Sequence, residues 1–305
     1  MGKSKTADPE DWNQYRTFLA FARGGTLAAA AGRLGSSIST VHRHLAQLEE
    51  TLGSRLFERR GRGQVLTPVG EALLARAERV EAEIVAIERE VAGRDATLRG
   101  TVVLTTTDTV AHRLLSRYIP AFRERLPEVH LQLHVDNRQY RLGRGEADVA
   151  LRPGRRPTEP DVVATEVGSA TFAWYAATEY LERRGRPRRK RDLMNHDAIV
   201  PDASLANVIY GRVAAELTDP ARWVLRAPSL LVQAMAVEAG AGVAALPCFL
   251  MDRRPGIERL FQPEIESPLW LLYHADLRHT ARVRAVVDLL AESLAADRAV
   301  LEGTA

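Results

Sequence analysis

The sequence predicts an α/β protein with a small helical head, a long charged helix and a larger body of alternating strands and helices. Three observations support this fold class. Residues 26–52 are typical of two amphipathic helices joined by a polar turn, residues 67–92 of one heptad-patterned helix, and short apolar strands alternate with helices from residue 101 onward. A chain of 305 residues exceeds one ordinary core, so we expect at least two domains.

The composition is that of a globular protein. Hydrophobic residues make up 46% of the chain and charged residues 27%. No apolar run reaches the roughly 18 residues that span a bilayer. The N-terminus lacks the apolar core of a secretory signal, and the single cysteine, Cys248, excludes an intrachain disulfide framework. We therefore expect a cytoplasmic protein without a membrane segment.

Three helices are predicted in the head. The first, residues 12–23, places its large apolar side chains on one face and ends at Gly24 and Gly25. In residues 26–52, Gly35 supplies a permissive backbone for the turn, and Ser36 or Ser37 can cap the helix that follows. That helix carries one apolar stripe, which must face a core: Val41, Leu45, Leu48 and Leu52.

The opposite face of the last helix is short of carboxylates and rich in hydrogen-bonding groups. Such groups can bond to the base edges or phosphates of double-stranded DNA. Between Arg16 and Arg62 there are eight basic residues against three acidic ones, which suits phosphate contact better than the whole-chain net charge of +3 indicates. The predicted DNA-binding residues of the two helices are Thr26, Ser37, Ser39, Thr40, His42, Arg43 and Gln47.

A hairpin wing is predicted after the third helix. Two short extended pieces in residues 56–67 flank a basic tip that contains glycine. Arg60 and Arg62 at this tip can reach across a phosphate ridge into a minor groove, whose negative potential favours guanidinium groups. The alternative is a solvated turn.

Residues 67–92 are predicted to form one helix, capped by Thr67 with Pro68 at its first position. Its apolar residues follow the heptad spacing of a coiled coil: Leu73, Ala77, Val80, Ile84, Ile87 and Val91. This narrow seam favours dimerisation, which would present two recognition helices to two DNA half-sites about one helical turn apart. The alternative is burial against the chain's own body.

After a hinge at residues 93–99, the alternation of strands and helices predicts a mainly parallel sheet packed between helices. The clearest strand is 129–135, in which apolar and polar residues alternate. The basic run 183–191 is interpreted as a solvated loop. The remaining predicted strands are 101–105, 148–151, 162–167, 172–176, 198–201, 223–225, 242–245 and 268–273, with helices near 114–122 and at 179–184, 229–239, 247–253 and 280–296.

Residues 18–74 carry, in one register, the pieces AAA at 28–30, LE at 48–49, LG at 52–53, LFER at 56–59 and LTPVG at 66–70. This segment resembles the LysR-type transcriptional regulators. The pieces GEADVA at 145–150 and AVEAGAGVAALP at 236–247, together with the tail from residue 269, resemble the effector domain of that family. The resemblance extends over nearly the whole chain.

The resemblance implies a winged helix-turn-helix DNA-binding domain at 11–66, a linker and dimerisation helix at 67–93, and an effector-binding domain at 99–297. The effector domain would be like periplasmic binding proteins, with one α/β lobe at about 99–167 and 268–297 and the other at about 168–267. The chain would cross between lobes near 167–170 and 266–269. The implied function is sequence-specific transcriptional regulation in response to a small-molecule effector. The implied partners are DNA, a second copy in a homodimer that can become a homotetramer, and RNA polymerase.

Effectors of open α/β sheets bind at the carboxyl ends of strands, where loops and helix N-termini gather. By this rule the predicted effector-binding residues are Thr106, Thr107 and Asp108 in the first lobe, with Asp202, Ser204 and Ser229 in the second.

The recognition helix departs from the family at two positions. Many members carry glutamine near its start and serine in its middle, where this chain has Ile38 and His42. Ile38 cannot donate a hydrogen bond, so it either contacts a thymine methyl group or packs. The DNA half-site usual for the family is therefore not carried over.

Three other functions were weighed. For an enzyme, the eight histidines show no metal-ligand spacing, and neither a Gly-x-Ser-x-Gly elbow nor a phosphate loop is present. We thus expect no catalysis, no cofactor and no metal site. For a redox sensor, Cys248 lies in an apolar run without a second cysteine, which favours a buried thiol. The third alternative is a regulator that has lost its ligand and binds DNA constitutively, and the sequence does not decide between this function and a response to a ligand.

Overall fold

The computed structural model describes residues 12–60, 63–93, 97–138, 140–205 and 208–304. The chain forms two compact units that divide between Glu88 and Arg89, and each is described by itself. Residues 1–11 and the middle of the predicted hinge lie outside the described residues. Within the described ranges, no helix has the length and apolar character needed to cross a membrane.

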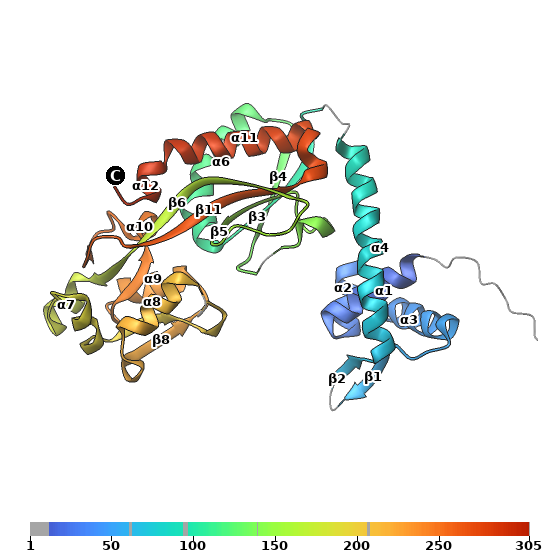
Figure 1. Ribbon diagram of the computed structural model, residues 1–305, viewed down its shortest axis with the longest axis horizontal. Helices are drawn as coiled ribbons and strands as arrows, with labels where there is room; N and C mark the ends of the chain where they lie inside the picture. The colour runs from blue at the N-terminus through green and yellow to red at the C-terminus, as the bar shows by residue number, and fades with distance from the viewer. Residues whose placement is uncertain (1–11, 61–62, 94–96, 139, 206–207, 305) are drawn as a thin grey trace, which may run out of the picture. The chain divides into compact units, whose positions relative to one another are not determined.

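The first unit begins with three helices: α1 Trp12–Gly24, α2 Leu27–Leu34 and α3 Ile38–Leu52 (Figure 1). Thr26 caps α2, since its Oγ1 accepts from the amide of Ala29 at 3.1 Å. Gly35 ends α2 with φ at 59°, a left-handed conformation that glycine adopts at no steric cost. Of the two predicted caps for α3, Ser37 is the one that accepts, from the amide of Thr40 at 3.1 Å.

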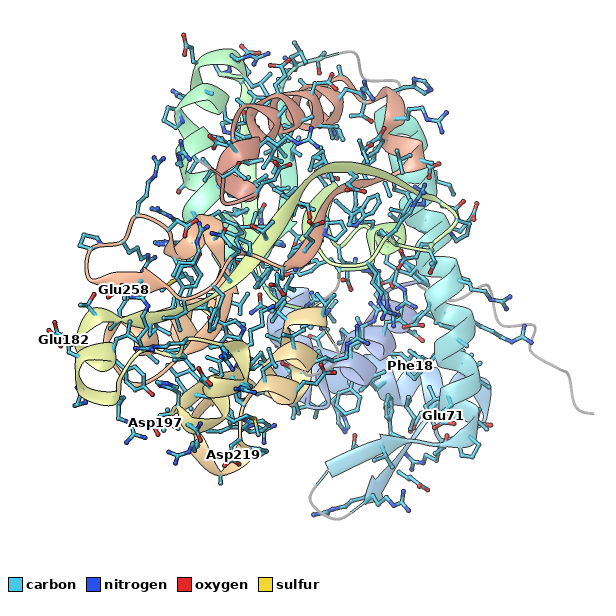
Figure 2. The ribbon with its side chains drawn as sticks, turned by 60° about the vertical axis from the view of Figure 1, so that its left-hand side comes forward. Phe18, Glu71, Glu182, Asp197, Asp219 and Glu258 are labelled. Atoms are coloured by element: carbon cyan, nitrogen blue, oxygen red, sulfur yellow. The ribbon has the colours of Figure 1, made fainter. Side chains whose placement is uncertain are left out.

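The three helices enclose a core of their own. Phe18 is fully buried among them (Figure 2), and Val41, Leu45 and Leu48 of α3 are buried as the stripe predicts. Leu52 differs, because its side chain is 38% exposed in the last turn of the helix. The expectation of a fully covered stripe is therefore wrong at its final position, where α3 extends past the helices that pack against it.

A wing follows α3, as predicted. Strands β1 Phe57–Arg60 and β2 Gly63–Leu66 pair antiparallel, with Arg60 opposite Gly63. The tip, which includes Arg62, lies outside the described residues.

Helix α4, Pro68–Gly93, continues from the wing. Thr67 caps it as expected, accepting from the amide of Gly70 at 3.0 Å. Gly70 is required here because a Cβ atom would lie 2.2 Å from the carbonyl oxygen of Leu56. Leu73 and Leu74 pack against the core of the first unit, and Ala77 is buried in it. The first residues of the predicted seam, Leu73 and Ala77, therefore pack into the core of the chain's own head.

The second unit is built on a seven-stranded mixed sheet of β3 Gly100–Thr106, β4 Val129–Val135, β5 Val149–Pro153, β6 Val162–Ala177, β9 Ala244–Pro247, β10 Ile257–Arg259 and β11 Ile265–His274. Strand β3 is parallel to both β4 and β5, whereas β6 and β11 pair antiparallel with each other and with their other neighbours. The expectation of a mainly parallel sheet is thus wrong outside β4, β3 and β5. Apolar periodicity reports which face a strand buries and carries no information on its direction.

Strands β6 and β11 are the two segments predicted to cross between lobes. Residues 162–172 of β6 pair with the whole of β11, with Gly168 opposite Leu269 and Ala170 opposite Ser267. The sequence divides β6 into two strands, but the structure holds one continuous strand of 16 residues. Its small residues 168–170 do not interrupt it, since pairing with β11 continues across them.

A second, two-stranded parallel sheet holds β7 Ala198–Pro201 and β8 Trp223–Ala227. The longer helices around the two sheets are α6 Ser116–Arg125, α7 Thr178–Arg184, α8 Ile209–Leu217, α9 Leu230–Glu238 and α11 Ala281–Ala296. Helix α8 and strand β10 were not predicted. Short helices lie at α5 Asp108–Val110, Ala111–Leu115, Leu142–Arg144, Lys190–Asn195, Ala203–Leu205, Pro220–Arg222, α10 Cys248–Met251, Ala275–His279 and α12 Arg298–Leu301.

One large core joins these elements. Helices α6 and α11 lie along the same side of the sheet (Figure 1), and residues of β3, β6, β9 and α11 bury their apolar side chains together. Cys248 lies in this core and is fully buried.

The basic run 183–191 begins in the last turn of α7 and ends in the short helix Lys190–Asn195, so the predicted solvated loop is limited to residues 185–189, which are exposed except at Pro187. Several of its side chains are nevertheless ion-paired. Arg184 lies 3.4 Å from Asp197, Arg186 donates to Glu258 at 2.5 Å, and Lys190 pairs with Glu264. Asp197 and Glu258 are both marked in Figure 2. These carboxylates offset part of the positive charge of the run.

Candidate DNA-recognition surface and effector site

The outer face of α3 carries the predicted contact residues. Ser39, His42, Arg43 and Gln47 are exposed, and Thr40 is half-buried. The face is set by the register of the buried stripe, because Val41, Leu45 and Leu48 fix the rotation of the helix about its axis. Three hydroxyls cluster at its N-terminus, where Ser37 Oγ lies 2.8 Å from Ser39 Oγ and 2.9 Å from Thr40 Oγ1. This surface can donate to acceptors on phosphates and bases.

Two carboxylates follow Gln47 on α3: Glu50 is exposed and lies on the contact face at about 100° per residue, whereas Glu49 is bonded to the start of the wing. Glu49 accepts from the amide of Leu56 at 2.8 Å and from the guanidinium of Arg55 at 2.8 Å. Its carboxylate thus fastens the start of the wing to α3. This bonding keeps the charge of Glu49 away from the surface on which DNA phosphates would lie, while the exposed Glu50 remains on that surface.

Ile38 does not pack into the head. Its side chain is 52% exposed at the first position of α3, although it is one of the larger apolar residues of the helix. Of the two roles that the sequence left open for Ile38, exposure favours contact with a thymine methyl group.

His44 is a residue of the recognition helix that the sequence did not single out for a role. Its Nδ1 lies 3.0 Å from Oγ1 of Thr17, which donates its own hydrogen to the carbonyl of Asn13 at 2.7 Å. Thr17 Oγ1 must then accept, so Nδ1 of His44 carries a hydrogen. This bond ties α3 to α1 and orients the recognition helix. The available signal was the position of His44, three residues after Val41 and so beside the apolar stripe of the helix.

The wing contributes Arg59 and Arg60, whose side chains are exposed on β1. Arg62 was predicted beside them and lies outside the described residues. Thr26, also predicted, is exposed at the N-terminus of α2, where its side chain caps the helix.

The predicted effector residues of the first lobe fall into two groups. Thr106 is fully buried, and its hydroxyl donates to the carbonyl of Leu151 at 2.8 Å. Thr106 therefore fastens β3 to β5 and is a structural residue, which corrects the prediction. The sequence placed it at a strand end but could not show that its side chain turns into the core. Thr107 and Asp108 follow it at partly exposed positions.

Asp108 and Ser229 meet between the lobes. Ser229 Oγ donates to the carboxylate of Asp108 at 2.5 Å, and the same hydroxyl accepts from the amide of Val232 at 3.3 Å as the cap of α9. Asp108 thus lies at the positive end of a nine-residue helix. The sequence placed both residues in one site, and the structure brings them together.

Asp202 and Ser204 form a separate pair. The carboxylate of Asp202 accepts from the amide of Ser204 at 2.9 Å and from its hydroxyl at 2.5 Å. These hydrogen bonds hold the pKa of Asp202 below its usual value. The pair lies directly after β7, which runs parallel to β8, and β8 ends just before Ser229.

Two side chains near these residues, Tyr210 and Arg152, were not among those predicted from the sequence. Tyr210 of α8 stacks on Phe172 at 4.7 Å between ring centroids, and burial, followed by the charge of Asp108, raises its pKa. Arg152, the penultimate residue of β5, donates to Thr105 at 2.6 Å, and burial lowers the pKa of Arg152. Within the described part of the chain, Arg152 Nε is buried without a hydrogen-bond partner. A charged residue in the otherwise apolar strand 149–152 was the available signal.

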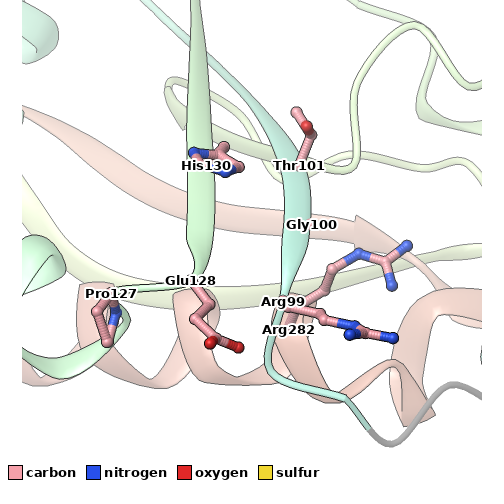
Figure 3. Close-up of a pocket in the computed structure, with 7 residues that line it drawn as sticks. All are labelled: Arg99, Gly100, Thr101, Pro127, Glu128, His130 and Arg282. Carbon is pink, nitrogen blue, oxygen red and sulfur yellow. The ribbon is translucent and has the colours of Figure 1, made fainter.

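A surface hollow of the second unit lies elsewhere. It measures about 720 Å³ and is formed at the amino ends of β3 and β4 by Arg99, Gly100, Thr101, Pro127, Glu128, His130 and Arg282 (Figure 3). Thr107 follows the carboxyl end of β3, and Arg152 lies near the carboxyl end of the neighbouring parallel strand β5. The predicted effector residues therefore do not line this hollow. Among the described residues, no group of three metal-ligating side chains could hold an ion.

These features define a class of protein: a winged helix-turn-helix head, with an exposed hydrogen-bonding recognition face, joined to an α/β domain of two lobes. The model for bacterial regulatory helix-turn-helix proteins of the lysR family matches residues 12–71, and that for the LysR substrate binding domain matches residues 95–295. The chain belongs to the LysR family, as the resemblance implied.

Similar proteins are regulators. A transcriptional regulator of Xanthomonas campestris is 31% identical over 186 residues, which cover 61% of this chain and 54% of that protein. The Mau operon transcriptional activator of Paracoccus denitrificans is 30% identical over 299 residues, covering 94% of this chain and 99% of that protein. The chain thus spans about half the length of the first relative and nearly all of the second.

Solved structures of the family share the fold. The full-length virulence activator AphB of Vibrio cholerae has a TM-score of 0.63 at 19% identity, covering 92% of this chain and 98% of that one. CrgA of Neisseria meningitidis has a TM-score of 0.57 at 23% identity, covering 93% of this chain and 99% of that one.

Proposed function

We propose that this LysR-family protein is a cytoplasmic, sequence-specific transcriptional regulator whose DNA affinity responds to a small molecule. The observation that carries the DNA-binding part is the outer face of α3, on which Ser39, His42, Arg43 and Gln47 are exposed and Glu49 is turned away. Thr26, Ser37 and Thr40 extend this surface at the helix starts, and Arg60 extends it along the wing, with Arg62 as a further proposed contact.

Selection of DNA by the purified full chain tests this function. Random duplexes that the protein retains should share one motif, and the Arg43→Ala variant should select a motif relaxed at one base pair. Binding that does not discriminate among sequences, and that disappears as salt rises, would contradict sequence-specific regulation.

We place the effector at Asp108, Ser229 and Thr107, between the lobes, with Asp202 and Ser204 at its edge. Support comes from the bond of Asp108 to the cap of α9, because a ligand that replaces either partner would change how the lobes meet. Arg152 adds a partly buried positive charge at the carboxyl end of a neighbouring strand. The site therefore suits a polar effector.

We propose that the protein is a homodimer through α4. Val80 is 49% exposed and Ile87 is 56% exposed, so the part of the seam beyond Ala77 presents apolar side chains that the first unit does not cover. A helix with such a seam buries it against a second copy.

A homotetramer would need another surface. Strand β4 ends the larger sheet and carries Leu133 and Val135 at 38% and 48% exposure, and β8 of the smaller sheet carries Val224 at 53%. Apolar side chains on strands of this kind favour association of effector domains. RNA polymerase remains a further proposed partner, and we propose no catalytic activity.

A redox-responsive regulator is the alternative of a different kind. Cys248 is fully buried and is the single cysteine of the chain. A thiol in apolar surroundings reacts slowly. The burial of Cys248 therefore favours a regulator that responds to a small-molecule effector over one that responds to oxidants.

A further inference from the structure

One ion-pair cluster joins the head to the linker helix. Arg23, in the last turn of α1, donates through Nη1 to Oε1 of Glu81 at 3.1 Å and through Nη2 to Oε2 at 2.6 Å. The same Nη2 lies 3.5 Å from Oε1 of Glu78. We name Arg23, Glu78 and Glu81 the Arg23 fork.

The geometry of the fork is directional. A guanidinium that donates two parallel hydrogen bonds to one carboxylate fixes both distance and plane, which a single point charge cannot do. The three side chains are only 21–23% exposed, so solvent screens them less than a surface pair. The hydrogen bond to Glu81 raises the pKa of Arg23.

The Arg23 fork lies just beyond the part of α4 that packs into the head. Ala77 is the last described residue of α4 that the apolar core of the head includes; Glu78 is the next residue, and Glu81 lies four residues after Ala77. In the next residues the apolar side chains Val80 and Ile87 are exposed. The fork therefore lies where α4 leaves the head.

The fork and the exposed seam occupy different sides of the same turn. At about 100° per residue, Val80 lies roughly 130° from the midpoint of Glu78 and Glu81 around the helix axis. One side of α4 is thus bonded to its own head, and the other presents the seam proposed to meet a second copy. The rotation of the head about α4 then sets where its recognition helix points relative to the dimer axis.

We infer that the Arg23 fork sets the angle at which each head is held on the linker helix and so selects the spacing between the two DNA half-sites. This inference rests on the proposed function, because half-site spacing has meaning only for a dimer that reads two half-sites. Arg23 is a positioning residue that acts through α4 and does not itself contact a base.

The test compares Arg23→Gln, Arg23→Lys and Glu81→Gln with the unaltered full chain. Affinity is measured for duplexes with a single selected half-site, and for duplexes with two half-sites whose separation is varied one base pair at a time. The matched control is Arg55→Gln, which removes the 2.8 Å pair with Glu49 inside the head and leaves α4 untouched.

The expected result is a change in spacing preference alone. All variants should bind the single half-site within about twofold of the unaltered protein, whereas Arg23→Gln and Glu81→Gln should lose ~10-fold of the preference for the best spacing. Arg23→Lys, which keeps the charge but not the fork, should resemble Arg23→Gln. Arg55→Gln should keep the preference.

Two results would overturn the inference. In one, the Arg23 and Glu81 variants weaken binding by the same factor at every spacing and on the single half-site, which is a purely structural effect. In the other, the preference is unchanged. Should Arg23→Gln unfold, as circular dichroism would reveal, Glu81→Gln and Arg23→Lys decide by the same two criteria. If the unaltered protein recognises no half-site, the proposed function itself fails.

Discussion

Three buried side chains of α3 fix which of its residues face outward. The contact face of α3 follows from the spacing of Val41, Leu45 and Leu48, so the exposure of Arg43 and His42 was predictable. The partners of Glu49 and His44 were not, since both depend on residues brought close by tertiary packing. Thr106 illustrates the same limit, because one residue of register decides whether a hydroxyl faces a ligand or the core.

Arg43 is expected to be the strongest base or phosphate contact of α3. Its side chain is exposed at the centre of the recognition face. Arg43→Ala should weaken binding to the selected DNA by about 1–3 kcal/mol if the guanidinium reads a base, and should relax preference at one position. Fluorescence anisotropy with single-base variants of the site measures both effects. Arg284→Ala, an exposed arginine of α11, is the control, and equal affinities for both variants would remove Arg43 from the contact set.

His196 should make stability depend on pH. Burial, with the charge of Arg184 next, lowers the pKa of His196 below its ordinary value of 6.5. The unfolded chain then binds the proton more readily than the folded one. The contribution of neutral His196 to the free energy of unfolding is therefore complete above the unfolded pKa and is lost as the pH falls through the lower folded pKa.

Replacing His196 with glutamine should flatten this part of the curve. Urea denaturation of the unaltered protein and of His196→Gln, at several pH values on both sides of about 6.5, gives the two slopes. The unaltered protein should lose more stability on acidification. Parallel curves would show that His196 is not the group responsible.

At the scale of elements, the ends of helices could be predicted from the sequence, whereas the surfaces against which their apolar faces pack could not. Ser37 and Thr67 cap α3 and α4 as their residue types indicate. The partner of each apolar face was not encoded locally. In α4 the heptad spacing is continuous, yet Ala77 is buried in the head and Val80 is exposed, because the head covers only the first part of the helix.

The exposed part of the seam should hold the dimer together. Val80→Lys places a charge where we expect a partner helix, so it should shift the dimer toward monomer. Glu83→Gln is the matched control, since it changes net charge by the same amount on an exposed position of the same helix. Sedimentation equilibrium over a range of concentrations reports the dissociation constant, and a dimer equally stable in both variants would mean that α4 is not the interface.

At the scale of the whole molecule, the class of fold was predictable and the strand directions were not. Alternating strands and helices indicated an α/β body, and the pairing of β6 with β11 lies where the lobe crossings were expected. That pairing is antiparallel, which no local pattern records. The continuity of β6 was hidden because its small residues at 168–170 are typical of a break.

An effector that binds between the lobes should stabilise the folded protein. A ligand that binds only the folded protein, at 100 times its dissociation constant, should raise the free energy of unfolding by roughly 2.7 kcal/mol. Thermal unfolding against a panel of small polar metabolites identifies such a ligand. Asp108→Ala should abolish the gain, whereas Asp288→Ala on α11 should retain it. A ligand that stabilises both variants equally would bind elsewhere.

The central claim is that two identical heads read DNA under the control of the effector domain. Hydroxyl-radical footprinting of the full chain on a selected DNA site tests it most directly. The account predicts two protected segments on one face of the duplex, about one helical turn apart, whose separation or intensity changes when a stabilising ligand is added. A single protected segment, or a pair that no bound ligand alters, would contradict it.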